Sequence, residues 1–104
     1  MIKVATLNSR NRRAGKKPKV VEVPLCLNLG SGPSKMPNFL SVDCIEFPGV
    51  DVVTDLSEKW PWKDSSVDVV HASHVLEHFE AIERVHFVNE LFRVLKPGGK
   101  ATVI

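Results

Sequence analysis

The sequence has only two cysteines among 104 residues and no long apolar run, and these absences narrow the possible classes of protein. No run of apolar residues approaches the roughly 18 that a membrane-spanning helix needs, and no apolar core of a signal peptide is present. Cys26 and Cys44 both lie in short, apolar, strand-like runs. We expect small buried side chains in a reducing compartment, without a disulfide or a metal site. The sequence therefore predicts a cytoplasmic protein with no membrane partner.

The length and composition fit one globular domain, but charge is divided unevenly along the chain. Apolar residues make up 43% of it and charged residues 25%, as is usual for globular proteins. Residues 1–23 carry seven basic side chains and one acidic side chain, a balance of +6. Because the whole chain carries +2, the other 81 residues carry −4. We therefore divide the chain into a basic N-terminal arm, residues 1–23, and a domain, residues 24–104.

The basic arm raises the question of a nucleic-acid partner. Asn8–Lys19 has no apolar residue except Ala14, which predicts a loop or arm, and Ile2–Leu7 predicts a short strand before it. Basic side chains of this kind could contact phosphates. No aromatic side chain lies between the charges to stack on bases. A solvated arm, or one docked on the acidic face of the domain, is therefore favoured over nucleic-acid binding.

Four apolar runs after residue 19 predict β-strands. Their Val, Leu and Ile residues do not alternate with polar ones, which is typical of strands buried on both faces of a parallel sheet. The runs are Val20–Leu29, in which the strand is entered after Pro24, then Phe39–Cys44, Val50–Thr54 and Val67–Ala72.

One amphipathic helix is predicted over Glu80–Leu95. Lys96–Gly99 should end it, with a cation at the C-terminal dipole, a proline that cannot continue the helix and glycines for a positive-φ cap. Lys100–Ile104 then begins a fifth strand. The expected apolar stripe consists of Ile82, Val85, Val88, Leu91, Phe92 and Leu95, opposite Glu83, Arg84, Asn89 and Glu90.

The connections between the first three strands are too short for regular crossover helices. Gly30–Asn38 holds nine residues, two of them prolines, and leaves room for at most one helical turn. Ile45–Gly49 is shorter still. The sequence thus predicts an α/β fold with a Rossmann-like, mostly parallel sheet of about five strands. Its long helix precedes the fifth strand.

The stretch Leu27–Gly32 ends the first strand in two glycines one residue apart. Backbone without a Cβ can approach a ligand closely, although Gly-x-Gly also forms ordinary turns. Asp43 ends the second predicted strand and Asp55 follows the third. In a parallel sheet these residues would meet at the carboxyl edge, where open α/β sheets bind ligands.

Five segments of the chain, in this order and at this spacing, resemble class I S-adenosylmethionine-dependent methyltransferases. They read LNLGSG, FLSVDC, VDVVTDL, PWKDSSVDVVHASHVLEH and RVLKPGG. The resemblance covers Leu25–Ile104 and is greatest to the type 11 methyltransferase domain, which has a shortened first crossover. It implies a strand order of 3-2-1-4-5, S-adenosylmethionine as cofactor, and methyl transfer to an unknown acceptor.

Carried over residue by residue, the resemblance implies one wall of a cofactor site. Gly30, Ser31 and Gly32 would lie against the aminocarboxypropyl part of the cofactor. Asp43 would accept hydrogen bonds from both ribose hydroxyls, a role that suits a carboxylate. Asn28 stands where the family often has an acidic residue that helps to hold the methionine ammonium, and an amide offers no charge there.

The resemblance also implies the adenine and methionine ends of that site. Asp55 would accept a hydrogen bond from the adenine amino group, while the Leu56 amide donates to a ring nitrogen. His71, Ala72 and Ser73, at the end of the fourth strand, would line the methionine end near the departing methyl.

Several of these residues also have a purely structural interpretation. Asp43 could cap the turn that follows it, and Asp55 could be the N-cap of a short helix beginning at Leu56 or Ser57. Trp60-Pro61-Trp62 could wall the adenine pocket, but aromatic residues around a proline more often pack on the core.

His74-Val75-Leu76-Glu77-His78 supports a minor alternative function. H-x-x-E-H is the signature of inverted zinc peptidases, in which two histidines one helical turn apart bind zinc and the glutamate acts as base. The interpretation needs a helical segment and a third ligand, for which the nearby choices are Glu83, His86 and Glu90. We favour the methyltransferase and expect no metal site.

Two expectations complete the interpretation. If the acceptor is protonated, His71 or His74 could serve as general base, since imidazole titrates near neutrality. The family's sheet has seven strands, whereas five are predicted here, so the domain would be incomplete and the fifth strand would be a bare edge. That edge suggests a homo-oligomer, and it keeps open a non-catalytic module for a cofactor or nucleotide that needs a partner chain.

Overall fold

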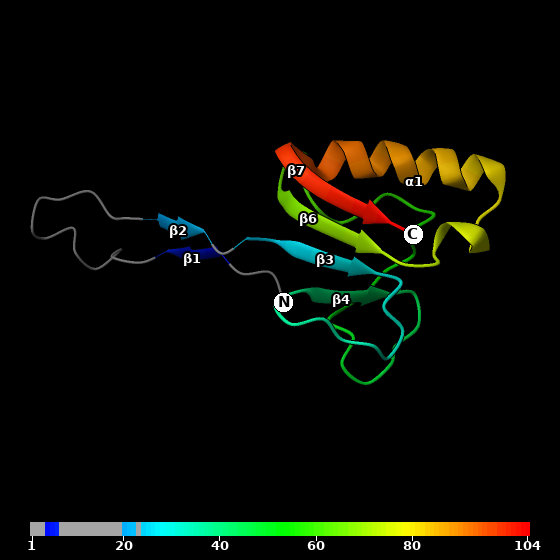
Figure 1. The fold of residues 1–104 in the computed structure, drawn as a ribbon, viewed down its shortest axis with the longest axis horizontal. Coiled ribbons are helices and arrows are strands. Elements are labelled where there is room, and N and C mark those ends of the chain that lie inside the picture. The colour runs from blue at the N-terminus through cyan, green and yellow to red at the C-terminus, as the bar shows by residue number, and fades with distance from the viewer. Residues whose placement is uncertain (1–3, 7–19, 23) are drawn as a thin grey trace, which may run out of the picture.

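The computed structural model describes residues 4–6, 20–22 and 24–104, with side chains from residue 24 onward. Two short strands, β1 (Val4–Thr6) and β2 (Val20–Glu22), pair antiparallel as a separate sheet (Figure 1). β1 lies within the strand expected at Ile2–Leu7, and the loop expected over Asn8–Lys19 lies outside the described residues. Because β2 belongs to this small sheet, the first strand of the main sheet begins only after Pro24.

The main sheet has five parallel strands in the order β5-β4-β3-β6-β7. In chain order this is 3-2-1-4-5, so the predicted α/β class and strand order are confirmed. The strands are β3 (Cys26–Leu29), β4 (Leu40–Asp43), β5 (Val52–Val53), β6 (Val67–Ala72) and β7 (Leu95–Val103). No described helix interrupts the connections β3–β4 and β4–β5, as their lengths predict.

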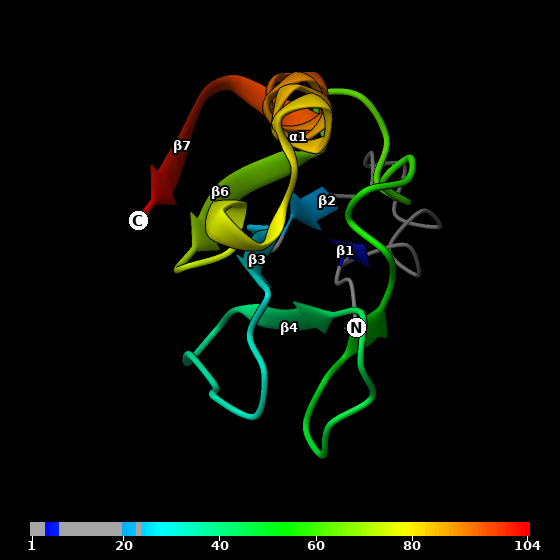
Figure 2. The same ribbon diagram turned by 90° about the vertical axis from the view of Figure 1, so that its right-hand side faces the viewer.

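The helix α1 (Ala81–Val94) lies on one side of the sheet and follows a short 3-10 helix, η2 (Leu76–His78) (Figures 1 and 2). A capping box starts α1, since the Glu80 amide donates to the Glu83 carboxylate at 2.9 Å. Among the described residues, no helix has the length and apolarity needed to cross a membrane.

The predicted apolar face of α1 is largely wrong. The buried residues are Phe87, Glu90, Leu91 and Val94, at spacings i, i+3, i+4 and i+7. Ile82 is 79% exposed and Phe92 75% exposed, and Val85 and Val88 are exposed as well. The helix has apolar residues around most of its circumference, so periodicity alone did not determine which side faces the sheet. Glu90, expected on the polar face, is part of the buried one.

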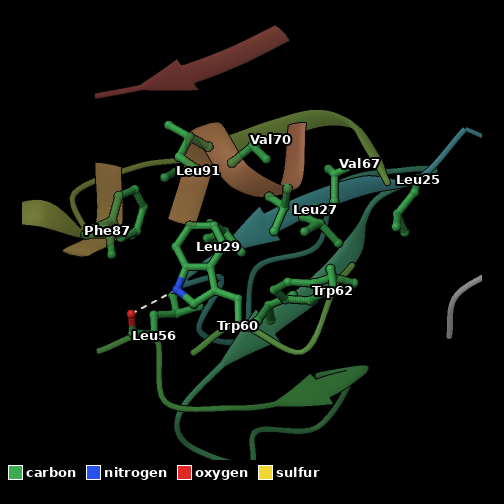
Figure 3. Close-up of a cluster of buried hydrophobic side chains, with 14 residues drawn as sticks. Leu25, Leu27, Leu29, Leu56, Trp60, Trp62, Val67, Val70, Phe87 and Leu91 are labelled. Carbon is green, nitrogen blue, oxygen red and sulfur yellow. Dashed lines mark hydrogen bonds between the residues drawn. The ribbon is translucent and has the colours of Figure 1, made fainter. Parts of the chain in front are cut away.

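The core joins the sheet to α1 and to the segment between β5 and β6. Leucines and valines of β3, β4 and β6 pack with Phe87 and Leu91, and both tryptophans are buried (Figure 3). Trp60 meets Phe87 edge-on with ring centroids 5.0 Å apart, and it meets Trp62 edge-on at 6.2 Å. The structural interpretation of Trp60-Pro61-Trp62 is therefore the one observed.

The end of α1 differs from the expected glycine cap. The helix passes into extended backbone at Leu95, where β7 begins. Val67 pairs with Leu95 but Val69 pairs with Lys100, so residues 96–99 bulge out of register. Gly98, at φ +82°, lies in this bulge. The glycines thus shape the entry into β7 and do not cap the helix.

Candidate functional site

A cavity of about 440 Å³ lies at the carboxyl ends of the central strands. Its walls come from the turn after β3, the loop after β4, the turn after β5 and the segment between β6 and α1. The lining residues are Gly30, Ser31, Gly32, Asp43, Cys44, Ile45, Phe47, Asp55, Leu56, His74, Val75, His78 and Phe79. This is the edge at which open parallel sheets hold ligands.

The turn after β3 needs its glycines. Gly30 has φ +65°, and a Cβ built on it would lie 2.5 Å from Cγ2 of Val75, so a side chain here would strain the backbone and displace the Val75 side chain. Gly32 has φ +55°, and a Cβ there would meet nothing within 4 Å. The Ser31 amide donates to the Val42 carbonyl at 3.0 Å, which holds the turn beside β4. Backbone is therefore open to the cavity at Gly32.

Asp43, at the end of β4, connects two walls of the cavity. Its Oδ2 accepts a hydrogen bond from the Gly32 amide at 2.7 Å, and its Oδ1 accepts one from the Ile45 amide at 3.1 Å. The carboxylate thus ties the glycine turn to the loop after β4. The structure therefore shows the turn cap that was one of the two interpretations of Asp43. The same carboxylate also lines the cavity, where the other interpretation, a ribose ligand, would need it.

Cys44 lies next to Asp43 and is exposed, which corrects the expectation that both cysteines are buried. Partial burial, and then the negative charge of Asp43, raise the pKa of the Cys44 thiol. Cys26 is half-buried at the start of β3, and both cysteines are free.

Asp55 and Leu56 form the wall beyond β5. The Asp55 carboxylate accepts hydrogen bonds from the hydroxyl of Ser57 at 2.6 Å and from its amide at 2.9 Å, and these bonds lower the pKa of Asp55. This is cap-like geometry, but it closes a turn and no helix follows. The Leu56 side chain is buried in the core. An ionised carboxylate and a buried apolar side chain therefore stand side by side at this wall.

The segment after β6 places His74 and His78 at the cavity. His74 has φ +58°, which is uncommon for a residue with a Cβ, and its Nδ1 lies 3.3 Å from Oε1 of Glu77. Only Leu76–His78 are helical, as one 3-10 turn, so the two histidines are not one α-helical turn apart. The helical condition of the zinc-peptidase alternative is not met. Among residues whose side chains are described, no group of three or more His, Cys, Asp or Glu could hold a metal ion.

Four residues expected at the site do not line the cavity. Asn28 lies between Leu27 and Leu29, which face the core, so its side chain points to the opposite face of the sheet. His71 pairs in register with Asn28 and shares that face. Ala72 and Ser73 also lie outside the lining.

Six lining residues were not predicted for the cofactor site: Cys44, Ile45, Phe47, Val75, His78 and Phe79. Three of them directly follow the strand-ending Asp43, and the position after a strand end was the signal that could have indicated them. The others follow from the path of the backbone around His74.

The chain is similar to known proteins in part of its length. Residues 37–103 match the family model described as methyltransferase domain. The chain is 34% identical over 68 residues to a demethylmenaquinone methyltransferase of Chlorobaculum tepidum, covering 65% of this chain and 27% of that protein. It is 43% identical over 53 residues to a probable S-adenosylmethionine-dependent methyltransferase of Mycolicibacterium smegmatis, covering 51% of this chain and 20% of the relative.

A third relative is a phthiotriol/phenolphthiotriol dimycocerosates methyltransferase of Mycobacterium ulcerans, 44% identical over 55 residues. That match covers 50% of this chain and 18% of the relative. The matched part of the chain thus spans between about a sixth and just over a quarter of these curated relatives.

Proposed function

Because the chain belongs to the methyltransferase domain family, we propose that its cavity binds S-adenosylmethionine and that the domain takes part in methyl transfer to an acceptor. The observation that carries the proposal is the convergence of the glycine turn, Asp43, Asp55 and Leu56 on one cavity. These residues come from three different strand ends.

The residues present fit this cofactor. The cavity volume of about 440 Å³ lies in the range of small-molecule pockets. Gly32 leaves room for close approach to the backbone, and the carboxylates of Asp43 and Asp55 are acceptors for hydroxyl and amino groups. Ile45 and Phe47, which lie between the two aspartates in the sequence, contribute apolar side chains to the lining of the cavity. Asp43 would hold the ribose, and Asp55 with the Leu56 amide would hold the adenine.

When bound, S-adenosylmethionine supplies an activated methyl group on a sulfonium. The chain then has to align an acceptor with that methyl and exclude water, which asks little of acid or base groups. We propose His74, which lines the cavity, and not His71 as the base for a protonated acceptor. The Glu77 carboxylate would orient the ring through Nδ1, leaving Nε2 to take the proton. The positive φ of His74 supports a functional constraint at this position.

Calorimetric titration with S-adenosylhomocysteine tests the proposal. We expect one site per chain with micromolar affinity, and we expect methyl transfer from S-adenosylmethionine to some member of an acceptor pool. Absence of heat at 1 mM ligand would contradict cofactor binding. Binding without transfer to any acceptor would favour a non-catalytic module.

Alkylation of Cys44 locates the ligand. At pH 8.5, saturating S-adenosylhomocysteine should slow alkylation of Cys44 about tenfold or more, because this exposed thiol lines the proposed site. Peptide mapping by mass spectrometry gives the rate for each cysteine. Cys26 is the internal control, since it lies at the opposite end of the strands and its rate should not change. Equal protection of both thiols, or of neither, would place the ligand elsewhere.

We also propose a cytoplasmic location and self-association. Two free cysteines are typical of a reducing compartment. Among the described strands, β7 has a neighbour on one side only. Three apolar side chains are exposed nearby in the chain: Ile104 after β7, and Ile82 and Phe92 on α1. An unpaired edge and exposed apolar side chains favour association with a second copy.

Phe92→Glu should weaken that association. We expect concentration-dependent dimers of the parent chain in analytical ultracentrifugation, and a dimer dissociation constant about tenfold higher for Phe92→Glu. Val53→Glu is the matched control, because Val53 is also exposed but lies on β5, at the other edge of the sheet. A parent chain that stays monomeric at 200 µM would refute the proposal.

A further inference from the structure

An ion pair on α1, between the buried Glu90 and the half-buried Arg93, lies outside the cavity and has no part in the proposed chemistry. Glu90 is 8% exposed, and its carboxylate accepts two hydrogen bonds from the Arg93 guanidinium, at 2.7 Å from Nε and 2.9 Å from Nη2. It accepts a third from the Trp60 amide at 2.7 Å. A buried charge is retained at a cost unless it is paired and hydrogen-bonded, so the question is what this pair holds in place.

The pair holds the segment between β5 and β6. Arg93 donates to the carbonyl of Trp60 at 3.0 Å and to that of Trp62 at 2.9 Å. Together with the bond from the Trp60 amide to Glu90, these contacts fix the backbone of this segment on both sides of Pro61. The segment has no regular secondary structure of its own, so α1 supplies the partners that strands would otherwise supply.

Trp60 carries this constraint to the cavity. Its indole Nε1 donates to the Leu56 carbonyl at 2.9 Å, a bond drawn in Figure 3. The ring is 1% exposed and packs edge-on against Phe87 of α1, so its position is fixed independently of the cavity. A continuous series of hydrogen bonds therefore runs from Glu90 through Trp60 to Leu56, which lines the cavity.

The wall that receives this series is held by several contacts. The Leu56 side chain is buried in the core, the Thr54 amide donates to the Asp43 carbonyl at 2.9 Å, and Nε2 of His86 on α1 lies 2.7 Å from the Glu58 carbonyl. β5 consists of two residues, and the turn after it is closed by local bonds between Asp55 and its neighbours Ser57 and Glu58. These local bonds give the turn its shape. The indole bond of Trp60 adds a link that acts on the Leu56 backbone itself, because it joins that carbonyl to a ring packed in the core.

We infer that Glu90, Arg93 and Trp60 are positioning residues that set the place of Asp55 and Leu56, and through them the recognition of the adenine base. The inference rests on the proposed function, since the adenine is assigned to Asp55 and the Leu56 amide there. A small displacement of these two groups would cost more in base discrimination than in overall binding, because hydrogen bonds depend steeply on distance and angle.

The test compares two ligands on two variants of the full chain. S-adenosylhomocysteine presents a 6-amino donor and an unprotonated ring nitrogen, whereas S-inosylhomocysteine presents a carbonyl and an N–H there. Trp60→Phe keeps an aromatic ring beside Phe87 but removes the donor to Leu56. Discrimination is the dissociation constant of S-inosylhomocysteine divided by that of S-adenosylhomocysteine, both measured by calorimetry. We expect this ratio to fall about fivefold in Trp60→Phe. Glu90→Gln should lower the same ratio.

Trp62→Phe is the matched control. Trp62 is buried in the same segment, and no hydrogen bond from its indole nitrogen is present among the described residues. We expect its ratio to stay within twofold of the parent. A role in stability alone would weaken both ligands equally, so an unchanged ratio in Trp60→Phe would overturn the inference.

Amide hydrogen exchange separates this inference from the proposed function. In the ligand-free chain, Trp60→Phe should speed exchange at the Ser57 and Glu58 amides about tenfold relative to Trp62→Phe. If the parent chain bound neither ligand, the proposed function would fail, and the exchange rates would still decide the positioning role. Equal exchange in the two variants would overturn it.

Discussion

Replacing Arg93 with methionine should lower the free energy of unfolding at pH 7 by about 3–5 kcal/mol, because it leaves the buried Glu90 without its charged partner. Methionine keeps an apolar stem of similar length, but it leaves the Glu90 carboxylate buried without its two guanidinium bonds. For a small domain whose total stability is about 5–15 kcal/mol, this is a large fraction. Urea denaturation of the purified chain measures it.

Asp64→Asn provides the control for that measurement. Asp64 also binds Arg93, at 2.9 Å from Nη1, but its side chain is 79% exposed. A surface contact of this kind contributes about 0–1 kcal/mol because water screens it. A loss in Arg93→Met no larger than the loss in Asp64→Asn would contradict the role of Arg93 as the charged partner of the buried Glu90.

The pH dependence of the same variants gives an independent check. The hydrogen bonds from Arg93, and then from the Trp60 amide, outweigh burial and lower the pKa of Glu90 from 4.5 to about 2. Stability from a carboxylate with a lowered pKa is complete above its unfolded value and is lost as the pH falls through its folded value. The contribution of Glu90 to the stability of the parent chain should therefore be complete above about pH 5 and be lost between pH 4.5 and pH 2, and this acid loss should be smaller in Arg93→Met.

The strands were predictable from the residues and their order from the family resemblance, but the orientation of α1 was not. Uninterrupted runs of Val, Leu and Ile mark buried parallel strands, and the lengths of the loops after β3 and β4 exclude helical crossovers. For α1, hydrophobic periodicity favoured Ile82, Val85 and Phe92 as the buried face. The buried face includes Glu90, whose partners Trp60 and Arg93 make a charge tolerable there. Local pattern can indicate the pair with Arg93, three residues away, but not the contact with Trp60, thirty residues away.

The candidate site was predictable where it depends on strand ends. Gly30, Gly32, Asp43 and Asp55 meet because parallel strands bring their carboxyl ends to one edge, and that alignment follows from the fold alone. Asn28 and His71 were misplaced relative to the cavity because side chains in a strand alternate between faces, and both lie on the face away from α1. Cavity walls made by loops, such as Ile45 and Phe47, have no periodic signal.

Asp43→Asn should weaken binding of S-adenosylhomocysteine about 10- to 100-fold in calorimetry, because hydrogen bonds to a charged group contribute about 1.5–3 kcal/mol each. The parent carboxylate already accepts the Gly32 and Ile45 amides through separate oxygens. An amide side chain would turn one oxygen into a donor that faces a backbone N–H, so the glycine turn or the loop after β4 loses its tie. The variant therefore loses both the charge offered to the ribose and the alignment of the turn.

Asp51→Asn distinguishes this effect from a general loss of stability. Asp51 also accepts a hydrogen bond from a backbone amide, that of Ser41 at 2.9 Å, but it does not line the cavity. Both substitutions remove a carboxylate that holds β4 or its loop, so we expect both to lower the free energy of unfolding by about 1 kcal/mol. Only Asp43→Asn should change ligand affinity by more than twofold. Equal affinity losses would mean that Asp43 supports β4 and not the ribose.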